Sequence, residues 1–215
     1  MPQSLSVFIR LIILAFGLFP LLVRAGDWYA TVGAGSDYVF RGISQTGGGA
    51  TASGGIEFVD FNNTYFGVWV SNTNLGTNGS YAGETDIYFG VSGKSEDTGY
   101  DFGYIAYQYP GNNPLNYEEF YAALSISGFT VKVSDSNTYG NYVEAALKFR
   151  FPGKRKVYVN LHLGRYNRDD FEDYHDANIS LQLNELTFTI SDTDLTATAD
   201  RSMKVFMNWE HNLDF

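Results

Sequence analysis

The segment NYVEAALKFRFPGKRKVYVNLHLGRY, residues 141–166, carries the pattern that decides the fold. In each half, apolar side chains occupy every second position and polar or charged side chains fill the positions between them. A short link at residues 151–154 separates the halves. Because successive side chains of a β-strand point to opposite faces, each half predicts a strand with one apolar and one polar face. Together the halves predict an antiparallel hairpin.

The same alternation recurs along the rest of the chain and predicts twelve strands. The strand at 99–109 is apolar in both phases, so its two faces stay unassigned. After residue 25 no run approaches the 18 apolar residues that indicate a membrane-spanning helix. The expected strands are 27–44, 49–61, 64–74, 81–93, 99–109, 116–128, 129–135, 141–151, 155–166, 175–184, 185–193 and 202–215.

The links between these strands fall into two classes. Those after the even-numbered strands are mostly short, for example 61–64 and 127–129, whereas those after the odd-numbered strands are generally longer, for example 72–80 and 193–202. Short turns at one rim and longer loops at the other are typical of bacterial outer-membrane barrels. We therefore predict an all-β fold, a closed antiparallel up-and-down transmembrane β-barrel of about twelve strands.

The first 25 residues have the layout of a secretory signal peptide. Arg10 precedes an apolar run at 11–23, and Val23-Arg24-Ala25 puts small or modest side chains at the −3 and −1 positions of a cleavage site. A retained membrane anchor is the alternative, but the run is shorter than the ~20 residues of a spanning helix, and Pro20 interrupts it. We predict cleavage after Ala25, which leaves residues 26–215 as the barrel.

Composition agrees with a secreted barrel and excludes several functions. The leader holds two of the 14 basic residues and no acidic one, so 12 basic and 24 acidic residues give the remaining chain a charge of −12. Such a chain is a poor partner for nucleic acid, which binds through an excess of Lys and Arg. It has no cysteine, and therefore no disulfide, thiol nucleophile or cysteine metal ligand.

The last strand ends on an aromatic residue, Phe215, after alternation through Val205, Met207 and Trp209 that His211 alone breaks. This ending is similar to the assembly signal of outer-membrane barrels. We expect Phe215 and its strand to engage the barrel assembly machinery, and the finished barrel to contact outer-membrane lipid and lipopolysaccharide.

The segment SDYVFRGISQT, residues 36–46, closely resembles the N-terminal signature of the TorF-type putative porin family of proteobacteria. Residues 47–49, 54–58 and 65–72 and the final Phe are similar to that family as well. The resemblance implies a barrel of the bacterial outer membrane that conducts small solutes. It names no substrate and transfers no catalytic residue.

If the apolar phase faces lipid, the other phase lines the interior, where charged side chains set ion preference. Within this set we expect Asp37 and Arg41 to form an inward ion pair; a role for both in folding or assembly is the alternative. The expected lining is Asp37, Arg41, Glu57, Glu84, Asp86, Glu119, Glu144, Lys148 and Lys156, with Arg150, His162, Lys204 and Glu210 in the same phase or at the rims.

Two functions remain open. The first is a porin-like channel for passive diffusion of small polar solutes or ions, with a preference for cations because the chain is acidic. The second is a filled structural or interaction barrel that presents loops and does not conduct, since twelve strands lie between the side-chain-filled and the open barrels. An enzyme is not expected, because the three histidines accompany no Gly-x-Ser-x-Gly elbow, and no cofactor is implied.

The acidic stretch 169–176 is a further candidate site. Clustered carboxylates can bind Ca²⁺ or Mg²⁺, but this spacing fits no EF-hand loop and lacks its glycine. A solvated acidic loop is the favoured interpretation.

Overall fold

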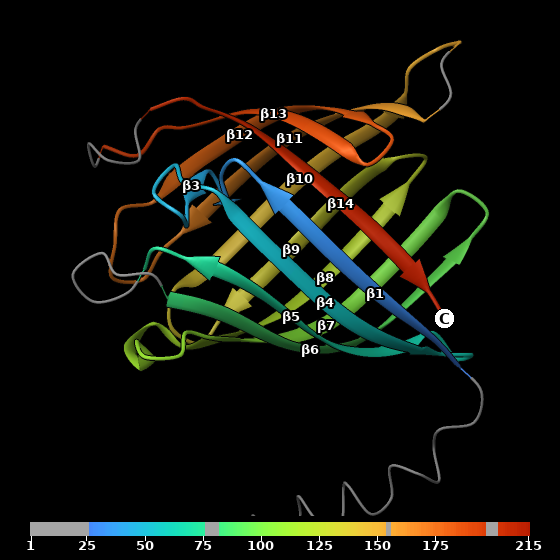
Figure 1. Ribbon diagram of the computed structural model, residues 1–215, viewed down its shortest axis with the longest axis horizontal. Helices are drawn as coiled ribbons and strands as arrows, with labels where there is room; N and C mark the ends of the chain where they lie inside the picture. Colours follow the sequence, from blue (N-terminus) through green and yellow to red (C-terminus); the bar gives the residue numbers. More distant parts are fainter. Residues whose placement is uncertain (1–25, 76–81, 154–155, 197–201) are drawn as a thin grey trace, which may run out of the picture.

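The computed structural model describes residues 26–75, 82–153, 156–196 and 202–215, so the leader predicted at 1–25 lies outside it. In this part of the chain twelve antiparallel strands close into one barrel (Figure 1). The barrel strands are β1 (Gly26–Gly35), β4 (Thr51–Asp60), β5 (Thr64–Thr73), β6 (Ala82–Ser95), β7 (Thr98–Gln108), β8 (Tyr117–Ile126), β9 (Phe129–Ser136), β10 (Gly140–Arg150), β11 (Val157–Asn167), β12 (Tyr174–Leu183), β13 (Leu186–Thr193) and β14 (Lys204–Asp214).

The first and last strands close the sheet. β1 pairs with β4 along its whole length and with β14 from Tyr29 to Gly35. Each barrel strand therefore has a partner on both sides, and the sheet has no free edge. The predicted closed antiparallel up-and-down barrel of about twelve strands is confirmed.

The predicted faces of the strands are also confirmed. On β12, Ile179 is 48% exposed on the outside, whereas the adjacent Ser180 is buried inside. Exposed Leu, Ile, Val and Phe recur in this way on β4 to β14, while the buried polar residues include Glu119, Ser134 and Thr189. The barrel thus has an apolar outer surface and a polar interior.

Strand β7, whose faces the sequence leaves unassigned, carries aromatic residues on both its outer and its inner face. Tyr100 and Phe102 are exposed on the outer face. Tyr107, in the opposite phase, is buried inside the barrel with Tyr109 and Tyr117. An apolar cluster inside the barrel therefore explains why this strand does not alternate.

The links sort to the two rims largely as predicted. Residues 127–128, between β8 and β9, form a two-residue turn in which Ser127 and Gly128 both have positive φ, at 51° and 87°. Two positive φ values characterise the type I′ turn that suits a twisted hairpin. Phe215 lies at this rim, where its backbone N–H donates to the carbonyl oxygen of Trp28 at 3.0 Å. On the opposite rim the 137–139 link is shorter than predicted.

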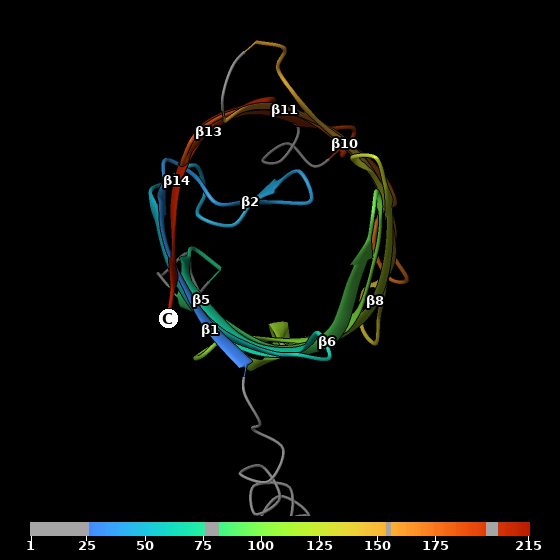
Figure 2. The ribbon, with the colours of Figure 1, turned by 90° about the vertical axis from the view of Figure 1, so that its right-hand side faces the viewer.

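One prediction about the fold is wrong. The first strand, expected at 27–44, ends at Gly35, and residues 36–50 leave the wall. They form a hairpin of β2 (Val39–Phe40) and β3 (Ile43–Ser44) that lies inside the ring of strands (Figure 2). We call residues 36–50 the inward hairpin. The link between β1 and β4 is therefore long, in agreement with its position at the rim that carries the longer loops.

The part of the chain that the structure describes contains one short 3-10 turn, η2 (Asn113–Leu115), in the link between β7 and β8. In the same residues, no helix is both long enough and apolar enough to span a membrane.

Because the wall has one apolar and one polar face, neighbouring positions of β12 are expected to differ in how well they tolerate a charged side chain. Ile179→Arg places a charge on the apolar outer surface and is expected to lower the free energy of unfolding in phospholipid bilayers by ~2–4 kcal/mol. Asn178→Arg places the same charge in the polar interior and should cost roughly 1 kcal/mol or less. Urea unfolding of the barrel in vesicles measures both. Equal destabilisation by the two substitutions would contradict the assigned faces.

Candidate functional site

The tip of the inward hairpin is a tight turn at Arg41-Gly42. Phe40 pairs with Ile43, and both tip residues have positive φ, 47° for Arg41 and 79° for Gly42. Gly42 also passes close to the barrel wall, since a Cβ added there would lie 2.8 Å from the Cβ of Asp176. Glycine suits this position because it combines a left-handed backbone with a close approach. The tip therefore spans the lumen and rests against β12.

Arg41 forms a bidentate ion pair with Glu119 of β8. Its two terminal nitrogens donate to the two carboxylate oxygens, each at 2.7 Å. The side chains are 7% and 2% exposed. Bidentate pairing is the strongest geometry that Arg and a carboxylate can adopt, and the removal of one partner leaves a buried charge uncompensated. We infer that the Arg41–Glu119 pair fixes the hairpin across the interior.

Aromatic rings surround the same guanidinium. Its carbon lies 4.3 Å from the ring centre of Tyr142 and 5.0 Å from that of Tyr166. Phe40 supplies a third ring at 4.7 Å. The hydroxyl of Tyr174 donates to the backbone carbonyl of Arg41 at 2.9 Å. Cation–π attraction and this hydrogen bond add to the ion pair, so four strands hold the tip.

The predicted ion pair between Asp37 and Arg41 is replaced by this arrangement. Asp37 is buried at the base of the hairpin, where its Oδ1 accepts hydrogen bonds from Ser44 at 2.6 Å and Thr46 at 2.7 Å. The carboxylate thus joins the two arms of the hairpin, while Arg41 reaches across the lumen to Glu119. The two residues stabilise the same loop at opposite ends.

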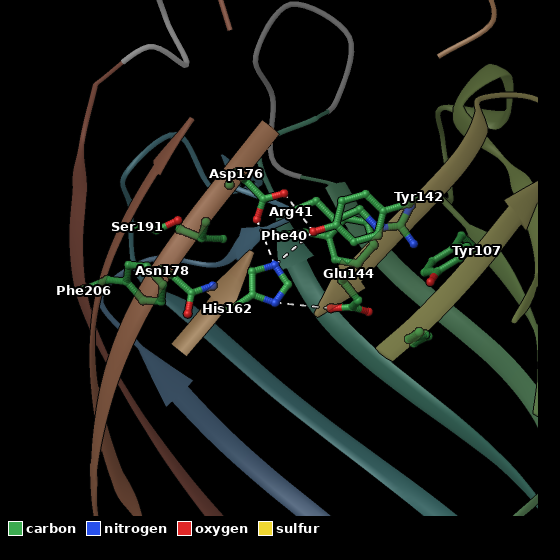
Figure 3. A pocket seen from close by; sticks show the side chains of 13 residues that line it. Phe40, Arg41, Tyr107, Tyr142, Glu144, His162, Asp176, Asn178, Ser191 and Phe206 are labelled. Atoms are coloured by element: carbon green, nitrogen blue, oxygen red, sulfur yellow. Dashed lines mark hydrogen bonds and ion pairs between the residues drawn. The ribbon is translucent and has the colours of Figure 1, made fainter. Parts of the chain in front are cut away.

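A polar cluster lies beside the tip (Figure 3). Asp176 accepts from the Tyr142 hydroxyl at 2.7 Å and lies 3.0 Å from Nε2 of His162. The other ring nitrogen of His162 lies 3.4 Å from Glu144. These residues and Arg41 border a cavity of about 170 Å³. The predicted interior residues Glu144 and His162 therefore meet in one hydrogen-bonded network.

Aromatic side chains surround a cavity of about 350 Å³ at the long-loop end of the barrel. The inward hairpin contributes Phe40, Ile43 and Gln45 to its wall. The strands and loops contribute Leu75, Tyr109, Leu115, Tyr117, Tyr139, Tyr166, Arg168, Phe171 and Tyr174.

The interior toward the short-turn rim is acidic. A cavity of about 450 Å³ is lined by Glu57, Asp86 and Asp101 together with aromatic rings. An adjoining cavity of about 360 Å³ shares Glu57 and adds Glu210. Of the described residues, no lysine or arginine lines either cavity. We call these two spaces the acidic chamber.

The remaining predicted interior residues lie in different places. Glu84 is 3% exposed, and one of its oxygens accepts from the Tyr109 hydroxyl at 3.1 Å. Lys148 lies 5.2 Å from the ring centre of Tyr158, nearer the short-turn rim. Lys156 does not line the interior: it is exposed in the turn between β10 and β11, because strand β11 begins one residue later.

The acidic stretch 169–176 does not gather into one site. Asp173 accepts from the backbone N–H of Arg168 at 2.8 Å, Glu172 accepts from the Thr196 hydroxyl at 2.7 Å, and Asp176 belongs to the cluster beside the tip. Across the described residues, no group of three acidic, histidine or cysteine side chains could hold a metal ion.

Several residues of the site are missing from the sequence prediction. Tyr142, Tyr166 and Tyr174 hold the tip, and Asp101 and Trp69 line the acidic chamber. All five fall in the inward phase of their strands. The prediction selected charged residues of that phase, so it left out the four aromatic residues. It left out Asp101 because the pattern of β7 did not assign the faces of that strand.

Comparison with known proteins gives the fold a context. The structure is similar to one titled "KdgM porin in complex with disordered oligogalacturonate", with a TM-score of 0.51 and 8% sequence identity. The similarity covers 89% of this chain and 98% of that chain. It is also similar to the outer membrane protein Omp33 of Acinetobacter baumannii, with a TM-score of 0.53 and 9% identity over 88% and 97% of the two chains. No curated protein matches the sequence.

At such low identity these likenesses establish a shared fold. The sequence itself matches a family model over residues 27–210, which include nearly all of the described barrel. The chain belongs to this family, described as bacterial protein of unknown function (Gcw_chp).

Proposed function

We propose that the protein is a porin-like channel of the bacterial outer membrane, through which small polar solutes diffuse passively. One observation carries the proposal: the closed barrel has an apolar outer surface and encloses cavities with charged side chains in their walls, one beside the tip of the inward hairpin and others toward the short-turn rim. An apolar outer face suits lipid, and a polar interior suits water and solutes. The shared fold with two outer-membrane proteins, one of them titled a porin, agrees with this function.

The same proposal covers the route to the membrane. Residues 1–25 would act as a cleaved secretory leader, and β14 with its terminal Phe215 would engage the barrel assembly machinery. The apolar outer surface would then contact outer-membrane lipid and lipopolysaccharide. Resemblance of residues 36–46 to the TorF-type putative porins supports this assignment, and these residues form the inward hairpin in the lumen.

The inward hairpin would form the constriction of the channel. It crosses the lumen, and the Arg41–Glu119 pair holds its tip. Solutes would pass from the aromatic cavity at the long-loop end, beside the hairpin, into the acidic chamber. In the described part of that chamber, carboxylates line the passage and no Lys or Arg does, so the passage would favour cations.

Conductance distinguishes the channel from a filled structural barrel. The purified protein, inserted in a planar lipid bilayer, is expected to give stepwise single-channel currents in KCl. In a KCl gradient the reversal potential should show preference for K⁺ over Cl⁻. A complete absence of steps from verified, folded barrels would instead support the filled barrel, in which the inward hairpin acts as a plug.

The acidic chamber is expected to set the ion preference. Glu57 borders both of its cavities, so Glu57→Gln removes a charge without a large change in volume and should lower the ratio of K⁺ to Cl⁻ permeability. Glu118→Gln is the matched control, because Glu118 lies in the outward phase of β8. Reversal potentials in the same KCl gradient compare the two. An equal shift in both variants would count against selectivity from the chamber.

Loss of the Arg41–Glu119 pair should release the constriction. Arg41→Ala leaves Glu119 buried without its partner, a change that typically costs ~3–5 kcal/mol, and here the hairpin can move to relieve it. Single-channel conductance is expected to rise, with larger current fluctuations. Arg165→Ala, at an exposed arginine of β11, should leave the conductance unchanged. Wild-type currents from folded Arg41→Ala barrels would show that the pair does not hold a constriction.

A further inference from the structure

One positive side chain lines the aromatic cavity at the long-loop end of the barrel. Arg168, in the link between β11 and β12, is the only charged residue in the wall of this cavity among the residues that the structure describes. Its Nε donates to the backbone carbonyl of Glu172 at 2.7 Å. Its guanidinium carbon lies 5.3 Å from the ring centre of Phe171 and 5.0 Å from that of Tyr174. These contacts hold the guanidinium beside the cavity.

The two terminal nitrogens of this guanidinium are available to a ligand. Within the described chain, Nε is the only side-chain nitrogen of Arg168 that forms a hydrogen bond, and the side chain forms no ion pair. Two parallel N–H donors on one planar group match the two oxygens of a carboxylate. The same protein uses this geometry in the buried pair of Arg41 and Glu119.

The carboxylates of the same loop do not fill this role. Glu172 accepts from the hydroxyl of Thr196, and Asp173 accepts from a backbone N–H within the loop. Asp169 and Asp170 are exposed to solvent, and neither lines the cavity. An anion that enters the cavity therefore meets a positive group in the wall and, in the described part of that wall, no carboxylate.

Aromatic rings lead from the centre of the barrel to this guanidinium. Tyr117 and Tyr139 meet edge to face, with 4.9 Å between their ring centres, and Phe171 follows at 6.3 Å from Tyr139. The guanidinium of Arg168 lies over Phe171. The hydroxyls of Tyr117 and Tyr139 donate to no other residue in the described ranges, so they remain available to a ligand. A flat ring packs well against such a series of rings.

The cavity is large enough and open enough to admit a guest. Its volume is about 350 Å³, and the inward hairpin closes it on one side with Phe40, Ile43 and Gln45. Phe171 is 58% exposed, so the wall next to Arg168 is in contact with solvent. A guest that joins one aromatic ring to one carboxylate matches both the rings and the single positive charge of this space.

We propose that the aromatic cavity is a binding site for small aromatic carboxylates. The terminal nitrogens of Arg168 donate to the two carboxylate oxygens, and the ring of the guest packs against Tyr139 and Phe171. Carboxylic acids are ionised at neutral pH, as this pairing requires. The inference goes beyond the proposed channel function, because binding needs only the folded barrel with its inward hairpin and does not need conduction.

Isothermal titration of the purified protein in detergent at neutral pH tests the site, with sodium benzoate as the probe. Benzoate is expected to bind saturably. Sodium acetate has the charge without the ring, and benzyl alcohol has the ring without the charge, so each should bind at least about tenfold more weakly, equivalent to 1.4 kcal/mol. Benzyl alcohol binding as tight as that of benzoate would overturn the proposal, because the cavity would then recognise the ring alone.

Substitutions locate the site. Arg168→Gln is expected to weaken benzoate binding by about tenfold or more. Arg165→Gln is the matched control, because it removes the same charge from an exposed position of β11 and should leave the affinity unchanged. Phe171→Leu alters an exposed ring of the wall, so it should weaken binding severalfold even if Arg168→Gln barrels do not fold. Wild-type affinity in folded Arg168→Gln barrels, or in Phe171→Leu barrels, would reject the site.

The planar-bilayer experiment separates this proposal from the channel function. Stepwise currents from a barrel that binds no benzoate would reject the carboxylate site and leave the channel intact. Saturable benzoate binding that depends on Arg168, in a barrel that gives no currents, would reject the channel and leave the site.

Discussion

The pairing of β1 with β14 is the constraint on which the rest of the structure depends. It turns an open twelve-stranded sheet into a cylinder whose strands all have two hydrogen-bonded neighbours. Backbone groups are satisfied within the sheet, so the wall can face lipid, where an unpaired N–H or C=O costs several kcal/mol. Closure also creates an inside, and the alternation of each strand then determines what lines it.

The inward hairpin depends on that enclosed space. Asp37 finds its partners within the hairpin, but in an open sheet the guanidinium of Arg41 would have no carboxylate partner. Inside the barrel, Glu119 and three tyrosines from β10, β11 and β12 supply partners from the wall. The hairpin divides the interior into an aromatic space and an acidic chamber. The carboxylates that line that chamber connect the fold to the cation preference that we propose.

Much of the wall was predictable from sequence, because alternation with a period of two indicates which face of a strand meets an apolar environment. Eleven of the expected strands match β4 to β14 to within a few residues, and Ile179 and Leu147 face outward as expected. The inward hairpin was not predictable, because Tyr38 and Phe40 continue the apolar phase of β1 although they belong to a hairpin inside the lumen. Long-range partners such as Glu119 for Arg41, 78 residues apart, leave no local signal.

The account rests on a wet interior and a lipid-facing exterior, and thiol labelling tests this most directly because the chain has no cysteine. Lys132→Cys places a thiol inside β9, and Val133→Cys places one outside at the next residue. In phospholipid vesicles, a charged, water-soluble thiol reagent should modify the first variant, and an apolar maleimide the second. The reverse pattern, or modification of both by the charged reagent, would contradict the account.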